Sequence, residues 1–168
     1  MLLFGMGLTK SIAQTDYQKI ITAITNDLQQ APFYTSANTS ITNNMPLLNS
    51  SGQFTDLVYG TTSNAANDAV WTTHLKRLRE FARGYTYPNS PSTHYAEPAL
   101  FAKIVLALQY FNSTGSIYTT ANWWERQIDY PQIIGQALIL MRGGSSTIAG
   151  ADENNALNTL QPAGRLAR

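Results

Sequence analysis

The sequence places two of its three tryptophans side by side, at Trp123 and Trp124. Neighbouring side chains in a helix point about 100° apart, so no single apolar stripe buries both rings. One ring can join the core, and the other needs a second partner, either a packed helix or a ligand with flat apolar faces. An indole combines a large apolar face with an N–H donor at its edge, which suits a hydroxylated sugar ring. The pair is therefore compatible with saccharide binding or with a structural role as an aromatic anchor.

Groups for metal or acid–base chemistry are few. The chain contains no cysteine, which excludes disulfides, thiolate metal sites and a cysteine nucleophile. No tight ligand spacing links His74, His94 and the carboxylates, so we expect no metal and no cofactor. A histidine on a helix near aromatic residues is more often packed or at the surface than catalytic, and we assign neither histidine a catalytic role.

The charge balance excludes some partners. The 168 residues carry a net charge of +1, and only 12% of them are charged, whereas a nucleic-acid-binding domain normally has a basic excess on one face. No apolar run approaches the roughly 20 residues that a membrane span requires. Asn, Thr, Ser and Gln are plentiful and Lys is scarce, which we interpret as a surface suited to an extracytoplasmic setting.

The first 14 residues differ from the rest of the chain. An apolar run from Leu2 to Leu8 precedes Ser11 and Ala13, small residues placed as a signal-peptidase site requires. The run is short and no basic residues precede it, so we interpret residues 1–14 as the remnant of a signal peptide. The alternative is a short amphipathic start to the first helix.

Hydrophobic periodicity predicts a first helix from Thr15 or Asp16 to about Gln30. Its apolar stripe comprises Ile20, Ile21, Ile24 and Leu28. Residues 31–67 are rich in Asn, Ser, Thr and Gly and show no sustained period. We therefore expect a long loop there, with at most one helical turn at residues 54–59.

A second helix is predicted from a cap at Asn67 and Asp68 to about Arg83, with Gly84 as its stop. Its apolar side comprises Val70, Trp71, Leu75, Leu78, Phe81 and Ala82. Another side carries the charged residues Lys76, Arg79, Glu80 and Arg83. We interpret this side as a solvated face with an ion pair between residues four apart, and contact with an acidic polymer is the alternative.

Three more helices follow. Residues 98–111 form a helix that is apolar around more than half its girth, which indicates burial between layers. A fourth helix begins at Asp129 or Pro131 and ends near Met141, and residues 152–160 form a weak fifth. No run alternates with period two for long enough to make a strand. The sequence therefore predicts an all-α fold of helix pairs.

The residues around the tryptophan pair carry a family resemblance. Asn122, Trp123 and Trp124 are followed by three variable residues, by Ile128, and by Pro131 at the entry to a Leu/Ile/Met-rich helix. This pattern resembles a signature in the N-terminal α/α-toroid domain of the family 8 polysaccharide lyases. These are the secreted bacterial hyaluronate, chondroitin AC and xanthan lyases.

The upstream sequence agrees with the same resemblance. The segment from His74 to Arg79, the turn from Tyr85 to Pro91 and the helix from Pro98 to Phe111 resemble the helix pair that precedes the signature. The resemblance spans roughly residues 17–168 and is most specific over residues 71–141. It implies a fold of antiparallel helical hairpins forming part of an incomplete (α/α) toroid.

The resemblance implies how substrate is held. Residues 15–168 are then the N-terminal portion of a toroid lyase domain, in which the adjacent tryptophans form an aromatic patch that positions a polyanionic chain. Trp123 and Trp124 are the expected substrate-binding residues, and Asn122 is expected to hold the local turn or to touch a sugar. The expected partner is an acidic polysaccharide of the hyaluronan, chondroitin or xanthan type. Family members often have Glu where this chain has Gln127.

The resemblance also implies a lyase reaction whose catalytic residues lie elsewhere. In the family, an Asn and a His neutralise the uronate carboxylate so that the C5 proton becomes acidic, and a Tyr removes that proton in a β-elimination. The Asn belongs to a Thr-Gly-Ala-Asn stretch after the double-tryptophan helix, and this chain ends at Arg168 before such a stretch. Gly150-Ala151-Asp152 lacks the Asn. We therefore transfer no catalytic role, and expect a missing C-terminal part of the same protein as a partner.

Two further interpretations remain open. A free-standing, non-catalytic carbohydrate-binding helical module predicts oligosaccharide binding that depends on the tryptophans. A structural or partner-binding helical domain predicts that both indoles lie in the core, where truncation of either ring costs about 3–5 kcal/mol of stability.

Overall fold

The computed structural model describes residues 6–30, 33–60, 65–88, 93–114 and 122–160, with side chains described from Asp16 onwards. The α-helices are α1 (Met6–Leu28), α2 (Phe33–Asn44), α3 (Ala65–Thr86), α4 (Pro98–Thr114), α5 (Tyr130–Arg142) and α6 (Gly150–Leu160). A 3-10 turn, η1 (Met45–Leu47), follows α2, and a π-helical segment, η2 (Glu125–Asp129), precedes α5. The described ranges contain no strand beyond an isolated bridge between Leu48 and Phe54. The prediction of an all-α fold is confirmed.

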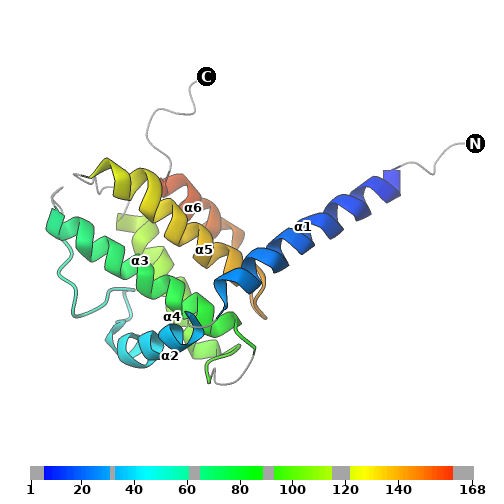
Figure 1. Cartoon of the computed structure of the whole chain (residues 1–168). Coiled ribbons are helices and arrows are strands. Elements are labelled where there is room, and N and C mark those ends of the chain that lie inside the picture. The colour runs from blue at the N-terminus through cyan, green and yellow to red at the C-terminus, as the bar shows by residue number, and fades with distance from the viewer. Residues whose placement is uncertain (1–5, 31–32, 61–64, 89–92, 115–121, 161–168) are drawn as a thin grey trace, which may run out of the picture.

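The helices α3 to α6 form two antiparallel hairpins that lie side by side (Figure 1). α3 and α4 run in opposite directions, and so do α5 and α6. Across the hairpins α3 packs on α5 and α4 packs on α6, while α2 covers another side of α3. Because each helix has an apolar stripe to bury, stacking hairpins in this way encloses a continuous core.

This core is centred on α3. Its fully buried side chains include Leu75, Leu78 and Phe81 of α3, Leu100, Ile104 and Leu108 of α4, and Ile133, Ile134 and Met141 of α5. Burial of one side chain of this size contributes roughly 1.5–3 kcal/mol. The core therefore fixes α5, and with it the helical segment that carries the tryptophan pair. None of the helices in the described ranges is long and apolar enough to cross a membrane.

The prediction of a long loop over residues 31–67 is wrong, because α2 occupies a third of it. Thr, Ser and Asn are weak helix formers, and the helix is held instead by packing of Ala37 and Ile41, which are fully buried against the core. Gly84 allows this approach, since a Cβ added there would lie 2.1 Å from Ile41 Cδ1. Gly84 is thus inside α3 and is not its predicted stop.

The first helix also differs from its prediction. α1 begins at Met6, not at Thr15 or Asp16, and runs through the predicted boundary after residue 14. Its N-terminal part projects away from the hairpins, and its C-terminal end packs on α5 (Figure 1). Only Ile21 of the predicted stripe is buried, while Ile20 and Ile24 are exposed. The apolar stripe does lie on a helix, as predicted, but few residues of the other helices pack against it.

The charged side of α3 is not the solvated face that was predicted. Glu80 and Arg83 are buried, and Arg83 Nη1 donates to Glu80 Oε1 at 2.6 Å, three residues apart rather than four. Arg83 Nε also donates to the Leu28 carbonyl at 3.0 Å, and its guanidinium lies 4.7 Å from the centre of the Phe33 ring. Arg83 thus contacts both Leu28 of α1 and Phe33 of α2, and it anchors the end of α1.

Candidate functional site

The tryptophan pair lies at the start of a continuous helical stretch that runs through η2 into α5. Asn122 precedes this stretch, and its Oδ1 accepts a hydrogen bond from the backbone N–H of Trp124 at 3.0 Å. The amide oxygen thereby satisfies one of the donors that a helix start leaves without a helical partner. Because of this cap, the helix begins at Trp123 rather than at the predicted Asp129 or Pro131.

Both indoles of the pair face solvent. Trp123 is 64% exposed and Trp124 is 46% exposed, whereas Trp71 is 2% exposed and belongs to the core. Ile128, in the next turn, is also exposed. Large apolar side chains gathered at a surface are typical of places that meet a ligand or another protein. This geometry contradicts the structural alternative in which both rings lie in the core.

The pattern of backbone hydrogen bonds changes from α-helical to π-helical directly after the pair. Pro131 has no N–H to donate to the Gln127 carbonyl four residues earlier, which breaks the α-helical pattern. The Tyr130 N–H bonds instead to the Glu125 carbonyl five residues earlier, which is the π-helical spacing. The Tyr130 hydroxyl donates to the Asp68 carbonyl of α3 at 3.1 Å and so fixes the register change against the core. Single π-helical turns of this kind are frequent at functional sites.

Two acidic side chains lie close together next to the pair. Glu125 is near Asp68, which is only 2% exposed and lies in the first turn of α3. Burial raises the pKa of Glu125 above its ordinary value, and the neighbouring charges of Asp68 and Asp129 raise it further. Burial likewise raises the pKa of the Tyr130 hydroxyl, which therefore stays protonated and remains a donor.

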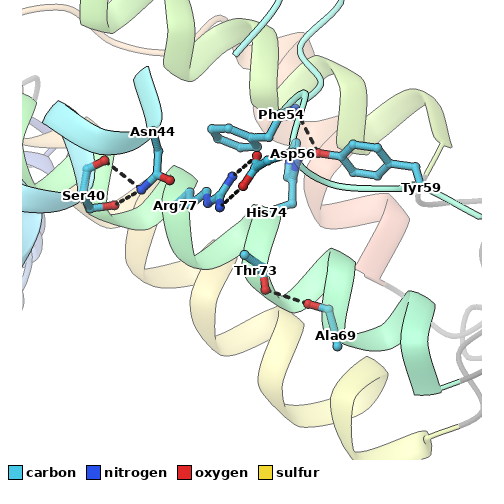
Figure 2. A network of polar contacts seen from close by, with 9 residues as sticks. All are labelled: Ser40, Asn44, Phe54, Asp56, Tyr59, Ala69, Thr73, His74 and Arg77. Carbon is cyan, nitrogen blue, oxygen red and sulfur yellow. Dashed lines mark hydrogen bonds and ion pairs between the residues drawn. The ribbon is translucent and has the colours of Figure 1, made fainter. Parts of the chain in front are cut away.

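His74 lies in a sealed polar network (Figure 2). Its Nε2 contacts the Ala107 carbonyl at 3.0 Å and must donate, since a carbonyl only accepts. Its Nδ1 therefore accepts from the Tyr59 hydroxyl at 2.8 Å, and the Tyr59 oxygen accepts the Phe54 N–H at 3.1 Å. Burial lowers the pKa of His74 to about 4. The ring is thus neutral at pH 7, holds the segment before α3 in place, and is out of reach of a glycan.

An ion pair holds the same segment from its exposed side (Figure 2). Arg77 donates to both carboxylate oxygens of Asp56, at 2.7 and 2.6 Å, and lies 4.8 Å from the centre of the Phe54 ring. These hydrogen bonds lower the pKa of Asp56. The paired fork geometry fixes orientation as well as distance. Residues 54–59, predicted as a possible helical turn, form no helix but are clamped to α3.

The second histidine is also remote from the tryptophans. His94 Nδ1 contacts Glu97 Oε2 at 2.7 Å. With Lys103 it lines a pocket of about 450 Å³ between α4 and the end of α2, whose walls include Ile41 and Met45. In the described ranges, no three His, Asp or Glu side chains gather in a way that could hold a metal ion.

Comparison with known proteins decides the family. Residues 15–164 match the model described as polysaccharide lyase family 8, N terminal alpha-helical domain. The chain belongs to this family. The family 8 domain is 28% identical over 105 residues to Chondroitinase-AC of Pedobacter heparinus, an alignment that covers 62% of this chain and 14% of that protein.

A solved chondroitinase AC lyase, from a study of enzyme–oligosaccharide complexes, has the same fold. It superposes with a TM-score of 0.71 at 22% identity. The superposition covers 84% of this chain and 20% of the chondroitinase AC lyase chain. The predicted arrangement of helical hairpins from an α/α toroid is confirmed by this likeness. The chain spans about a fifth or less of the length of the relatives it matches.

One contact of the site was not predicted. The sequence predicts Asp68 as part of a helix cap and counts Glu125 among the three variable residues after the tryptophans. The two residues come close because α3 packs against η2, and they are too far apart in sequence for any helical period to link them. Pro131 gives a local signal for the change of helical register, because its missing N–H removes one α-helical hydrogen bond, but it gives none for the position of Asp68.

Proposed function

We propose that this chain is the N-terminal helical part of a secreted lyase that cleaves acidic, uronic-acid-containing glycans by β-elimination. In this proposal Trp123, Trp124 and Asn122 belong to its substrate-binding surface. The observation that carries the proposal is the exposure of both indoles in a chain that belongs to polysaccharide lyase family 8. The names of the relatives, chondroitinase AC, favour a glycosaminoglycan as substrate, and a polymer of that size is met outside the cell.

The proposed contribution of this segment is binding rather than chemistry. The C–H face of a pyranose ring stacks on an indole, while the ring hydroxyls and the indole N–H hydrogen bond at the edges. The cap by Asn122 and the register fixed by Tyr130 order the backbone that carries the two rings before substrate arrives, which lowers the entropy cost of binding. We assign no catalytic residue within this chain, and His74 is sealed in the core.

Calorimetric titration of the chain with chondroitin, hyaluronan and xanthan oligosaccharides tests the binding surface. We expect Trp123→Ala and Trp124→Ala each to weaken binding about tenfold, the effect of losing roughly 1.4 kcal/mol of stacking. Tyr95→Ala is the matched control, because Tyr95 is an exposed aromatic residue on another segment. It should bind as tightly as the unchanged chain, and absence of binding to every acidic glycan contradicts the proposal.

The same variants separate this proposal from a purely structural role. Because both rings are exposed, truncation should cost less than about 1 kcal/mol in the free energy of unfolding. A loss of about 3–5 kcal/mol with no change in glycan affinity is the signature of a core residue. To separate a lyase from a non-catalytic binding module, this segment is assayed in the longer polypeptide, where absorbance of an unsaturated uronate product must rise with time.

A further inference from the structure

Arg126 is a cationic residue on the same helical stretch as the tryptophan pair. It lies three residues after Trp123 and is half-buried. Its backbone N–H bonds to the Asn122 carbonyl, four residues earlier, at 3.5 Å, so the first turn of the stretch has α-helical spacing. Residues three apart in such a turn are neighbours on the helix surface. The side chain of Arg126 therefore begins next to that of the exposed Trp123.

Arg126 is not paired with an acid of the chain. The other arginines of the described ranges all form ion pairs, which are Arg77 with Asp56, Arg79 and Arg83 with Glu80, and Arg142 with Glu153. No ion pair between described residues includes Arg126, although every Asp and Glu of the sequence falls in the described ranges. Its positive charge is therefore not neutralised by an Asp or a Glu.

Two acids lie close to Arg126 along the helix without pairing with it. Glu125 directly precedes it, but the Oε2 atom of Glu125 is inaccessible to solvent, and the exposed Lys76 of α3 offsets part of the charge of this carboxyl group. Asp129 lies three residues further on, and no ion pair joins it to Arg126 within the described residues. An acid group of a ligand can therefore reach Arg126 without displacing an ion pair.

The two exposed indoles have different neighbours. Trp123 is followed, three and four residues later, by the polar side chains of Arg126 and Gln127, whereas Trp124 is followed by Ile128, which is 45% exposed. The patch thus has a charged edge at Trp123 and an apolar edge at Trp124. A sugar that carries a carboxylate at the edge of its ring finds a partner for that group only at the first of these edges.

We propose that Arg126 selects acidic over neutral sugars, by pairing with the carboxylate of a uronate ring that stacks on Trp123. This inference rests on the proposed function and names the residue that reads the charge of the glycan. The planar guanidinium can donate two parallel hydrogen bonds to one carboxylate, and the indole face positions the ring that carries it. Arg126 is thus a specificity-determining residue, and it takes no part in making or breaking bonds.

Calorimetric titration with matched acidic and neutral ligands tests the inference. The ligands are unsulfated chondroitin and hyaluronan oligosaccharides, each compared with its carboxyl-reduced form, which loses the charge and keeps the ring face that stacks. We expect the unchanged chain to bind the acidic form roughly fivefold more tightly, as for an ion pair at a partly exposed site. Arg126→Gln should bind both forms equally, with the affinity of the unchanged chain for the neutral form. Arg126→Lys keeps the charge without the fork and should retain part of the preference.

Two further variants serve as controls. Lys19→Gln removes one positive charge from α1, where the Lys19 side chain is 73% exposed, and should keep the full preference for the acidic form. Trp124→Ala removes the ring at the apolar edge and should weaken both forms alike. Because salt screens exposed charges, added salt should reduce affinity for the acidic form less in Arg126→Gln than in Lys19→Gln.

Each outcome decides a separate question. Loss of the preference in Arg126→Gln, with unchanged affinity for the neutral form, supports the inference and also shows that the variant is folded. A preference that survives in Arg126→Gln overturns the inference and leaves the proposed function standing, and equal binding of both forms by the unchanged chain does the same. Binding of neither form by the unchanged chain ends the proposed function, and the inference falls with it.

Discussion

Complete burial of His74 ties folding to the neutral form of its imidazole. The pKa is about 4 in the folded chain, below the ordinary value of 6.5, so protonation favours the unfolded chain. The contribution of neutral His74 to the free energy of unfolding is fully present above pH 6.5 and is lost as the pH falls through 4. The total loss is on the order of 3 kcal/mol.

Urea denaturation from about pH 7 to about pH 4 measures this loss. We expect His74→Gln to show a shallower decline, because its amide can donate to the Ala107 carbonyl and accept from Tyr59 without titrating. Carboxylates such as Asp56, whose pKa is lowered, also lose their contribution in acid, so the comparison with the variant is essential. Parallel pH slopes for the two proteins place the titrating group elsewhere.

The sequence predicted which residues form the candidate binding site better than it predicted what packs around them. Adjacency of Trp123 and Trp124 was enough to show that one stripe cannot bury both, and the motif suggested their role. Their exposure depends on which segments pack nearby, and no local pattern determines that. The Asp68–Glu125 contact was invisible for the same reason, since it requires α3 and η2 to meet.

At the level of elements, two helical glycines have opposite surroundings. A Cβ on Gly84 would lie 2.1 Å from the buried Ile41 side chain, whereas a Cβ on Gly135 meets nothing within 4 Å. We therefore expect Gly84→Ala to destabilise the fold by about 1–3 kcal/mol through overpacking between α2 and α3. Gly135→Ala, its matched control, should stabilise by about 0.5–1 kcal/mol through helix propensity.

Thermal or chemical unfolding of these two variants measures both effects. If Gly84→Ala is as stable as Gly135→Ala, α2 does not press on α3 at this position. A loss of far-UV circular dichroism in Gly84→Ala, beyond that expected from one residue, indicates instead that α2 has left its site.

Periodicity predicted the helices whose sequences carry a regular apolar stripe and missed α2, whose sequence carries none. The helices α3, α4 and α5 carry regular apolar spacing and were found, with errors at their ends where Asn122 and Gly84 act through caps and packing. α2 was missed because its sequence is polar and buries only Ala37 and Ile41 completely. Its helical state follows from tertiary contact with α3 and not from local preference.

At the scale of the whole molecule, the two stacked hairpins place the tryptophan pair at one end of the α5 layer, while α1 joins near the other end (Figure 1). The hairpin fold could be predicted from the sequence because the predicted helix pairs and the family resemblance both implied it. The superposition on a chondroitinase AC lyase covers only 20% of that chain. The proposed lyase reaction therefore concerns a longer protein. The proposed binding surface can be tested in this chain alone.

The most direct test of the account follows the three indole N–H signals by nuclear magnetic resonance during titration with a chondroitin or hyaluronan oligosaccharide. The single-tryptophan variants Trp123→Phe, Trp124→Phe and Trp71→Phe assign the signals. We expect the signals of Trp123 and Trp124 to shift with saturable dependence on ligand, while that of the buried Trp71 stays in place. Unchanged signals of the exposed pair at millimolar glycan would contradict this expectation.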